Sequence, residues 1–498
     1  METELKFQVP PARSAALRRA VATSSARTVR LQALYADTAD QRLAAAGLAL
    51  RLRKEGRVWV QTLKGRGDGL MRRLEHEVRL PPQRGVPVLD PQRHAGTPVG
   101  DLLAVAMASG AELRTLYQTD IRRLHRRVRH GGALIEIACD HGRIVADGRS
   151  VAVDEIEFEL VSGPPAALPA LAARWAARFG LWWDVRTKSE RGFRLALGHD
   201  QVPAVKAGAA ALPAGAGPQQ AWCTVLQSAL AQALPNAVEI AAGTDAPEHL
   251  HQLRVALRRL RSALRWFADW GGDAEAAHAL EADWREPFGR LGAARDSDVL
   301  VHSLQPALHS AGAPPFDAMP AAADGGPGEI VRSVEFTTLL LRTLAMSLPP
   351  AHAADDGGVA ALRAAASRVL RRAWRRVLRD AQAFAAASVE EQHRTRKRLK
   401  RFRYGLEFLL PLLARKPALR MHRAVCSALD ALGHLNDLHT AEAWFRECAQ
   451  TDTRAWFAVG WAAASLPAAQ ATAAAMLARM ARLDRKAPPW RRRRRRQA

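Results

Sequence analysis

Like-charged side chains recur at alternate positions in the first 200 residues of the chain. Carboxylates recur in this way near the N-terminus and near residues 75 and 157, and cations do so near residue 52. The residues concerned are Glu2, Glu4, Arg51, Arg53, Glu75, Glu77, Glu155, Glu157 and Glu159. Residues two apart on a β-strand share one face, so these like charges repel unless a counter-charge lies between them. Cations arranged in this way could grip a polyanion, and the carboxylates could hold an accompanying metal ion.

The elements that must position these side chains are β-strands with one apolar and one charged face. Leu52 separates the two arginines, and Ile156 and Phe158 separate the last three carboxylates. We expect hairpins at the turn signals 54–56 and 140–142. An ordinary antiparallel sheet with one solvated face is the simplest alternative. The segregation of the strands by sign favours a closed barrel whose charges point inward.

Length and charge set the broad class of the protein. The chain has 498 residues, more than one typical core, so two or more domains are expected. Lys and Arg total 73 against 49 Asp and Glu, which gives a net charge of +24. This sign suits polyanions such as nucleic acid, phosphate polymers or anionic lipid. A genome biased toward Arg and Ala codons would give the same excess, so charge alone assigns no ligand.

Several common kinds of site are absent from the sequence. The four cysteines form no CxxC pair, which argues against a disulfide framework or a thiolate zinc site. Neither GxxxxGK[ST] nor HExxH occurs, which excludes a P-loop and a zincin centre. The N-terminus lacks the apolar segment of a signal peptide, and Pro and Gly break the one long charge-poor stretch, 207–238. We therefore expect a soluble cytoplasmic protein with no membrane partner.

Composition divides the chain into four predicted regions. Residues 1–200 carry the strand patterns, and residues 219–485 have helical patterns. An Ala/Gly/Pro-rich linker is predicted over 201–218. The tail 486–498 contains the arginine run Arg491–Arg496 and is predicted to be disordered. The expected fold class is an α+β barrel domain followed by an all-α domain.

The charged strand motifs, taken in order, resemble the CYTH family, the triphosphate tunnel metalloenzymes. The N-terminal Glu2-Thr3-Glu4-Leu5-Lys6 matches the ExExK signature of that family. The motifs that follow are Leu50–Arg53, Gln61–Gly65, Arg73–Glu77, Arg122-Arg123, Glu155–Glu159 and Lys188–Gly192. The resemblance covers roughly residues 1–198. It implies an eight-stranded antiparallel barrel whose tunnel binds a linear triphosphate and a divalent metal ion.

The same resemblance implies roles for individual residues. Triphosphate ligands are expected at Lys6, Arg51, Arg53, Lys64, Arg122 and Lys188. Metal ligands are expected at Glu2, Glu4, Glu157 and Glu159, with further tunnel positions at Glu75, Glu77, Glu136, Asp140 and Glu155. Adjacent strand residues point oppositely, so only one of Arg122 and Arg123 faces the tunnel, and we favour Arg122. Oxygen-only ligands suit Mg²⁺ or Mn²⁺.

The helical half contains an internal repeat. The segment 251–261 is echoed by 393–403, and Leu291–Asp296 is echoed by Leu432–Asp437, nearly 142 residues later. At about 100° per residue, one face of each first helix gathers a histidine and three cations. These residues are His251, Arg254, Arg258 and Arg261 in the first copy and His393, Arg396, Lys400 and Arg403 in the second. We expect no carboxylate on either face, which favours a polyanion site over a merely solvated surface.

The HxxRxxxRRxR pattern and its echo resemble the CHAD domain, the conserved histidine α-helical domain, over roughly 215–485. The resemblance implies two pseudo-symmetric helical bundles whose basic cavity binds inorganic polyphosphate through the eight residues just named. The arginine stripe over 368–379 adds a further basic surface. Asp296, Asp298 and Asp437 are expected to orient arginines or cap helices, and no active site is expected in this half.

The sequence therefore predicts a metal-dependent inorganic triphosphatase joined to a polyphosphate-binding module. The expected reaction converts tripolyphosphate to pyrophosphate and phosphate. Thiamine triphosphatase and class IV adenylate cyclase are alternatives for the same tunnel, and a non-catalytic polyphosphate-binding or granule-targeting protein is another. No specific nucleic acid is expected as a partner. Polyphosphate granules are an expected location within the cytoplasm, and the sequence does not assign the oligomeric state.

Overall fold

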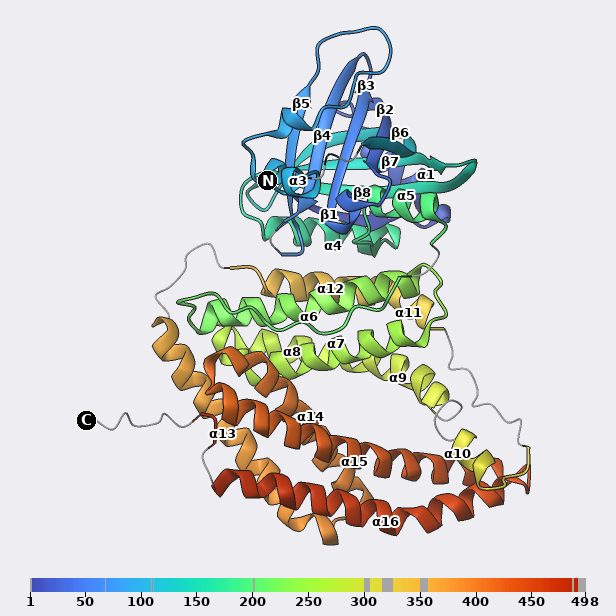
Figure 1. Ribbon diagram of the computed structural model, residues 1–498, viewed down its shortest axis with the longest axis vertical. Coiled ribbons are helices and arrows are strands. Elements are labelled where there is room, and N and C mark those ends of the chain that lie inside the picture. Colours follow the sequence, from blue (N-terminus) through green and yellow to red (C-terminus); the bar gives the residue numbers. More distant parts are fainter. Residues whose placement is uncertain are drawn as a thin grey trace. The chain divides into compact units, whose positions relative to one another are not determined.

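Nine strands form the N-terminal part of the protein, and helices form the rest (Figure 1). This computed structural model describes residues 2–67, 69–108, 110, 112–199, 202–299, 305–315, 326–349, 357–485 and 488–490, with the backbone alone at 293–299, 305, 484 and 485. Two compact units comprise Met1–Lys206, Leu230–Leu253 and Pro327–Ala351 in one, and Ala207–Ala229, Arg254–Gly326 and His352–Ala498 in the other. The predicted tail run Arg491–Arg496 lies outside the described residues.

Eight antiparallel strands close into a barrel, as predicted. Their order is β5-β4-β3-β2-β6-β7-β8-β1, and pairing of β1 with β5 closes the ring, while the short β9 adds to β1. The strands are β1 (Glu2–Gln8), β2 (Arg27–Thr38), β3 (Leu48–Glu55), β4 (Val58–Arg66), β5 (Arg72–Arg79), β6 (Leu113–His130), β7 (Ala133–Ala146), β8 (Arg149–Ser162) and β9 (Trp182–Trp183).

The barrel buries apolar side chains on its outer face, because helices cover that face. Leu50 and Leu63 pack with Val99 of α3, and Phe158 meets Trp175 of α4. The helices of this part are α1 (Pro11–Val21), α2 (Arg42–Ala45), α3 (Pro98–Ala106), α4 (Ala167–Phe179) and α5 (Lys188–Leu197). The inner face carries the charged side chains together with an apolar group, Leu31, Tyr35 and Tyr117, that packs against α5.

One of the two predicted hairpins is wrong. The chain turns between Glu55 and Val58 as expected, but β7 runs straight through 140–142. Asp140 of β7 forms an ion pair with Arg123 of the neighbouring strand β6, so Asp140 lies within the barrel wall. Gly142 lets β7 approach β6 closely, because a Cβ there would lie 2.1 Å from the Asp120 carbonyl oxygen.

The remainder of the described chain is all-helical, as predicted. Its helices are α6 (Pro218–Ala241), α7 (Pro247–Trp266), α8 (Ala274–Asp283), α9 (Arg285–Val299), α10 (Gln305–Ser310), α11 (Pro327–Arg332), α12 (Val334–Met346), α13 (Gly358–Ala383), α14 (Val389–Leu409), α15 (Arg415–Cys448) and α16 (Ala455–Ala481). Phe402 of α14 packs against Trp266 of α7 and Trp374 of α13, so the two repeat helices share an aromatic core. No described helix is long and apolar enough to span a bilayer.

The predicted domain limits of 200, 218 and 485 remain predictions. Residues 202–213 contain neither helix nor strand, in keeping with a connecting segment. Part of this segment is nevertheless held in place, since Asn236 bonds the backbone of Val205 and His249 bonds the carbonyl of Val202.

Candidate active site in the barrel

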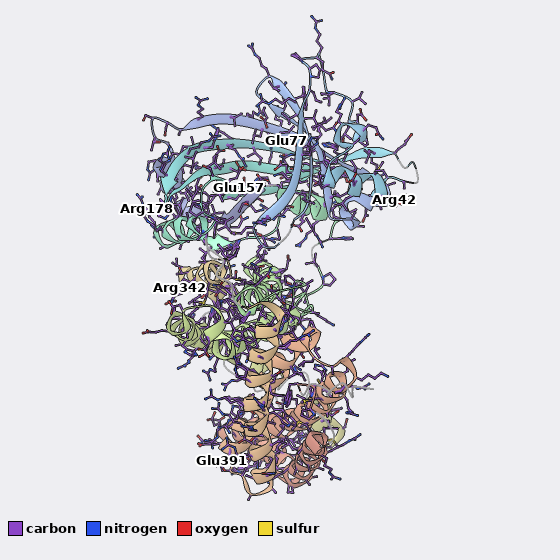
Figure 2. All side chains as sticks on the ribbon, turned by 90° about the vertical axis from the view of Figure 1, so that its left-hand side faces the viewer. Arg42, Glu77, Glu157, Arg178, Arg342 and Glu391 are labelled. Carbon is purple, nitrogen blue, oxygen red and sulfur yellow. The ribbon has the colours of Figure 1, made fainter. Side chains whose placement is uncertain are left out.

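The interior of the barrel is a chamber lined by the charged strand faces. Its volume is about 1060 Å³, and its walls come from all eight strands and from α5. Glu77 of β5 and Glu157 of β8 both line the chamber, and β1 lies between their strands in the closed ring (Figure 2). Every predicted tunnel residue lines this chamber or contacts a residue that does, except Arg122.

Strand β1 contributes two carboxylates that are paired with cations of neighbouring strands. Lys64 Nζ lies 2.7 Å from Glu2 Oε2 and 3.1 Å from Glu75 Oε2. Arg73 Nε lies 2.8 Å from Glu4 Oε1. Arg73 was missing from the predicted site, although its spacing of two from Glu75 places both on one strand face. These pairs fix the positions of the carboxylates at one end of the chamber.

Two carboxylates in this region remain short of positive charge. Burial, followed by a hydrogen bond with Glu2, raises the pKa of Glu75 to about 8. Burial would also raise the pKa of Glu2, but Lys64 and Glu75 hold it at about 2. Burial, with Glu2 and Glu136 nearby, raises the pKa of Glu159 to about 7. Among the residues described, Glu159 makes no hydrogen bond or ion pair, so a cation is the partner that it lacks.

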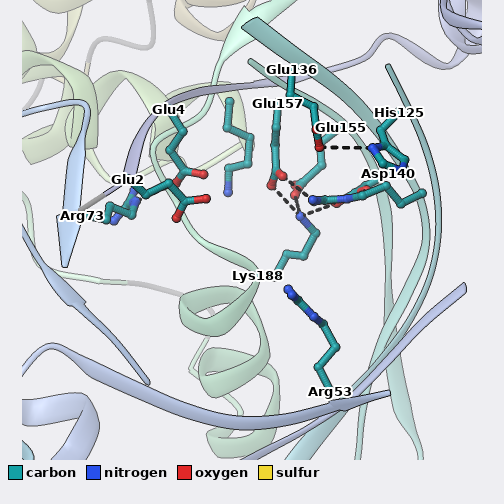
Figure 3. A network of polar contacts seen from close by, with 12 residues as sticks. Glu2, Glu4, Arg53, Arg73, His125, Glu136, Asp140, Glu155, Glu157 and Lys188 are labelled. Atoms are coloured by element: carbon teal, nitrogen blue, oxygen red, sulfur yellow. Dashed lines mark hydrogen bonds and ion pairs between the residues drawn. The ribbon is translucent and has the colours of Figure 1, made fainter. Parts of the chain in front are cut away.

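The neighbouring strands β7 and β8 hold a carboxylate cluster that is already neutralised. Lys188 Nζ lies 2.7 Å from Asp140 Oδ2 and 2.7 Å from Glu157 Oε1, and it also contacts Glu155 (Figure 3). Arg123 bridges Asp140, at 2.7 Å, and Glu157. Despite burial, Lys188 and Arg123 hold the pKa of Glu157 well below its usual range. The predicted metal ligand Glu157 therefore gives its charge to two cations in this structure.

The local sequence explains why Lys188 reaches this cluster. Thr187 caps the N-terminus of α5, and Glu190 completes a capping box with it. Lys188 is the first residue of α5, so the cap fixes the point from which its side chain enters the chamber. Lys6, the predicted ligand on β1, is buried and donates a hydrogen bond to the carbonyl of Arg186 just before this cap.

Two further predicted cations line the wall formed by β3. Arg51 donates to the Tyr35 hydroxyl at 3.2 Å and lies about 4 Å from Glu75 and Glu77. Arg53 Nη2 lies 3.1 Å from Glu77 Oε1. Arg53 extends across the chamber toward Lys188 (Figure 3). Two cations that face each other across a cavity suit an anion bound between them.

Glu136 sits beside the uncompensated Glu159 on the neighbouring strand. It contacts His125 at 3.2 Å and Arg127 at 3.3 Å, and the register places it directly opposite Glu159. Glu4 lies directly opposite Glu159 on the other side. A row of three carboxylates thus crosses β7, β8 and β1.

The expectation that Arg122 faces the tunnel is wrong. Arg122 is exposed on the outer face of β6, whereas Arg123 lies in the chamber. The turn at Gly131-Gly132 pairs His130 with Ala133, and this register brings Arg123 opposite Asp140. Because side chains alternate along a strand, Arg122 must point the other way.

In the helical half, the cations of α7 are held by neighbouring helices. Arg254 donates to the Gly292 carbonyl at 2.9 Å, and Arg258 lies 5.6 Å from the Phe288 ring centre. Arg261 pairs with Glu281 of α8 at 2.8 Å. His251 lies half-buried one turn earlier on the same helix.

The matching face of α14 contains Lys400, which has two arginines nearby. Desolvation, then Arg258 and Arg396, lower the pKa of Lys400 to about 6. His393 Nδ1 lies 2.8 Å from Asn436 Oδ1. The expectation of a carboxylate-free face is wrong for α14, because Arg403 pairs with Glu407 of its own helix at 3.4 Å.

The structure describes the side chain of one of the three aspartates that were expected to orient arginines or cap helices. Asp437 lies among Arg396 and Lys400, in agreement with an orienting role. The side chains of Asp296 and Asp298 lie outside the described residues. The described arginines of the stripe over 368–379 are exposed on α13.

The chamber fits a divalent metal ion by the chemistry of its donors. Asp140, Glu155 and Glu157 offer oxygens within 4.8 Å of one another, but Lys188 already lies among them. Glu159 has no cationic partner among the described residues. Burial makes its charged form unfavourable and so raises its pKa. A site whose protein ligands are all carboxylate oxygens, without imidazole nitrogen or thiolate sulfur, suits Mg²⁺ and Mn²⁺.

Comparisons with known proteins divide the chain in the same way. The CYTH domain model matches residues 1–188, and the CHAD domain model matches residues 224–446. An inorganic triphosphatase of Haemophilus influenzae is 26% identical over 161 residues, which cover 32% of this chain and 44% of that enzyme. The match thus spans less than half the length of this relative.

Solved structures resemble each part separately. The CHAD domain of the plant Ricinus communis is 28% identical, covers 58% of this chain and 99% of its own, and has a TM-score of 0.43. A putative adenylate cyclase of Bacillus halodurans is 18% identical, covers 39% and 97%, and has a TM-score of 0.29. A Hippeastrum protein, described as a putative adenylyl cyclase with dominant triphosphatase activity, is 23% identical, covers 41% and 98%, and has a TM-score of 0.30.

Proposed function

From a chain that matches the CYTH domain over residues 1–188 and the CHAD domain over residues 224–446, we propose that the barrel is a metal-dependent inorganic triphosphatase. The reaction converts tripolyphosphate to pyrophosphate and phosphate. The observation that supports it most is a contrast along β8: cations neutralise Glu155 and Glu157, whereas Glu159, two residues further on the same strand face, has no partner among the described residues. The cations of the chamber would complement a phosphate chain, and the unpaired carboxylate would complement a metal ion.

The metal ion, Mg²⁺ or Mn²⁺, would be held by Glu2, Glu4 and Glu159. Bound there, it would neutralise charge on the phosphoryl oxygens and act as a Lewis acid. Glu157 remains a candidate ligand, although its present partners are Lys188 and Arg123. Glu75, with a pKa of about 8, holds a proton near neutral pH and limits the negative charge at this end.

The cations of the chamber would bind and orient the phosphate chain. Arg51, Arg53 and Lys64 offer donors from one side, and Arg123 and Lys188 offer them from the other. Arginine presents planar donor pairs that match phosphate oxygens. Phosphoryl transfer depends mainly on positioning and charge stabilisation, so this set of residues supplies what the chain itself must provide.

The reaction is tested by measuring phosphate release from the full-length chain. Tripolyphosphate, ATP, thiamine triphosphate and long polyphosphate are supplied in turn with Mg²⁺ or Mn²⁺, and Glu159→Gln serves as the control for contaminating phosphatases. We expect tripolyphosphate to be the best substrate and the variant to lose the activity. Release of cyclic AMP from ATP would favour a cyclase, and a folded chain inactive on all four compounds would favour a non-catalytic polyphosphate-binding role.

For the helical half, we propose binding of inorganic polyphosphate. The supporting observation is the desolvated Lys400 beside Arg258 and Arg396, which joins the two copies of the repeat in one cationic cluster. A thin, flexible polyanion can enter such a cluster, whereas duplex DNA is wider. The proposed extents remain 1–200 for the barrel and 219–485 for this module, and association with polyphosphate granules would follow from such binding.

Polyphosphate binding is tested in a chain that lacks residues 491–498, because the arginine tail would attract any polyanion. Arg258→Ala combined with Lys400→Ala should weaken polyphosphate binding strongly and leave the helical content unchanged. DNA is added as competitor at equal phosphate concentration, since both ligands respond to salt. Displacement of polyphosphate by DNA would contradict the proposal.

A further inference from the structure

A groove of about 540 Å³ lies on the outer face of the barrel, away from the chamber. It crosses β2, β6 and β7, and its walls include Arg30, Asp120, Arg122, His141, Gly142 and Arg143. Three of these side chains are arginines, one is a histidine and one is a carboxylate. The chamber residues of the same strands, such as Arg123 and Asp140, point to the opposite face.

The strand register places like charges directly side by side in this groove. Arg30 of β2 lies opposite Arg122 of β6, and Arg122 lies opposite His141 of β7. Directly opposed side chains lie about 4.5–5.5 Å apart at Cβ, and like charges at this spacing destabilise a sheet. Binding of an anion along the row of Arg30, Arg122 and His141 would therefore reduce the repulsion between these side chains.

The one carboxylate of the groove is already committed to Arg30. Arg30 Nε and Nη2 donate to the two Asp120 oxygens at 2.9 and 2.6 Å, and this bonding lowers the pKa of Asp120. Within the described part of the chain, Arg122 and Arg143 make no hydrogen bond or ion pair. His141 lies 3.9 Å from Asp154, at the limit of an ion pair. Arg122 and Arg143 thus line the groove without a side-chain ion pair among the described residues, and the carboxylate opposite Arg143, Asp120, is bonded to Arg30.

The arrangement of the two arginines indicates which anion would fit. Arg143 lies opposite Asp120, so Arg122 and Arg143 are diagonal neighbours on adjacent strands. Diagonal neighbours are about 7–8 Å apart, a span that long guanidinium side chains can close around a small ligand. Guanidinium forks pair well with phosphate oxygens. A ligand with two phosphoryl groups offers oxygens to both arginines at once.

We propose that this groove is a second phosphate-binding site, outside the barrel chamber, which takes a short inorganic phosphate chain such as pyrophosphate. Arg122 and Arg143 bind the phosphoryl oxygens, and Arg30 is held in place by Asp120. The proposal does not depend on the reaction in the chamber. It assigns a role to Arg122 that its exclusion from the chamber left open.

Arginine footprinting on the full-length chain tests the proposal. Phenylglyoxal modifies accessible guanidinium groups, and mass spectrometry reports the rate at each arginine, with inorganic pyrophosphate as the probe. Arg114 and Arg129 are matched controls, because both are exposed on β6 but do not line the groove. Pyrophosphate should slow modification of Arg122 and Arg143 and leave the two controls unchanged. Equal slowing at all four arginines, or equal protection by sulfate at the same ionic strength, would overturn the proposal.

A second measurement separates the groove from the chamber. Equilibrium dialysis counts bound pyrophosphate in the intact protein and in Arg122→Gln combined with Arg143→Gln. The variant should lose one bound pyrophosphate per chain and keep its phosphate release from tripolyphosphate, because neither side chain lies in the chamber. An unchanged number of bound pyrophosphates per chain would contradict the groove site, whether or not the chamber is active. The count does not depend on catalysis, so it tests the groove even if the chamber hydrolyses nothing.

Discussion

Glu4 of β1 and Glu159 of β8 lie directly opposite each other on the inner face of the barrel, but only Glu4 has a cation. Arg73 pairs with Glu4 at 2.8 Å, whereas no described residue pairs with Glu159. Burial, with Glu2 and Glu136 nearby, raises the pKa of Glu159 to about 7. Two residues of one type at paired positions therefore have opposite effects on stability.

Replacing Glu159 should stabilise the metal-free protein while it removes activity. The folded chain keeps a proton on Glu159 up to about pH 7, and the unfolded chain releases it near pH 4.5, so stability is lost as pH rises through this window. Glu159→Gln removes this loss, which is about 1–2 kcal/mol at pH 8 after allowance for solvent screening. Thermal unfolding at pH 5 and pH 8, without metal, measures the difference.

The matched control is Glu4→Gln, which breaks the ion pair with Arg73 and should lower stability at both pH values. Equal unfolding temperatures for Glu159→Gln and the unaltered protein at pH 8 would show that Glu159 has a counter-charge in solution.

Lys188 should be essential for stability as well as for binding phosphate. It is the shared partner of Asp140, Glu155 and Glu157, and burial keeps water from replacing it. Lys188→Met leaves the three carboxylates with Arg123, which contacts Asp140 and Glu157, and Arg191, which contacts Glu155. The loss of the shared cation should cost about 3–5 kcal/mol of unfolding free energy. Urea denaturation measures the loss. Lys54→Met is the control, since Lys54 contacts only the Trp59 ring among its described neighbours; a similar loss there would argue against the ion cluster as the cause.

Arg122 and Arg123 should differ sharply in their effect on triphosphate hydrolysis. Arg123 contacts Asp140 and Glu157 inside the chamber, and Arg122 lies outside it. We expect Arg123→Gln to lower kcat/KM by about 10²–10³-fold, as the loss of one charge-stabilising donor does. Arg122→Gln should leave kcat/KM unchanged. Circular dichroism checks that both variants fold, and the reverse order of effects would contradict the register.

Most of the chamber could be predicted because the strand period is two. Glu2, Glu4 and Lys6 alternate along one strand and therefore share a face. The same alternation within each other strand groups its charged residues on one face. Strand β6 was the exception, because apolar and charged residues do not alternate cleanly around Ile121-Arg122-Arg123-Leu124. The position of the two-residue turn Gly131-Gly132 determines which residues of β6 and β7 face each other. The turn pairs His130 with Ala133, so Arg123, seven residues before His130, pairs with Asp140, seven residues after Ala133.

The partners of the helical cations could not be predicted from the helix pattern. Arg261 pairs with Glu281, which lies on another helix, so only tertiary packing brings them together. The pairing of Arg403 with Glu407 was accessible, because residues four apart on a helix are neighbours. It was missed because Glu407 lies one turn beyond the repeated segment.

Polyphosphate binding to the helical half should take up protons near neutral pH. Desolvation, then Arg258 and Arg396, lower the pKa of Lys400 to about 6, so at pH 7.5 the amine is mostly neutral in the free protein. A bound polyanion favours the charged amine and raises its pKa, which draws up to about one proton from the buffer. Titration calorimetry in two buffers of different ionisation enthalpy measures this uptake. Lys400→Met should abolish it, and uptake that persists in this variant would assign the proton to another group.

Cys426 should react faster with alkylating agents than Cys448, although both lie half-buried on α15. Cys426 Sγ lies 3.8 Å from the His422 ring nitrogens, and His422 Nε2 lies 2.9 Å from Glu407 Oε1. The bonds to Cys426 and Glu407 raise the pKa of His422 to about 9, so an imidazolium faces the Cys426 sulfur at neutral pH. A neighbouring cation makes a cysteine more reactive. Burial instead raises the pKa of Cys448. Iodoacetamide labelling followed by mass spectrometry at pH 7 should show about tenfold faster modification of Cys426. Glu407→Gln should reduce this ratio by lowering the pKa of His422, and equal rates at the two cysteines in the unaltered protein would contradict an effect of His422 on Cys426.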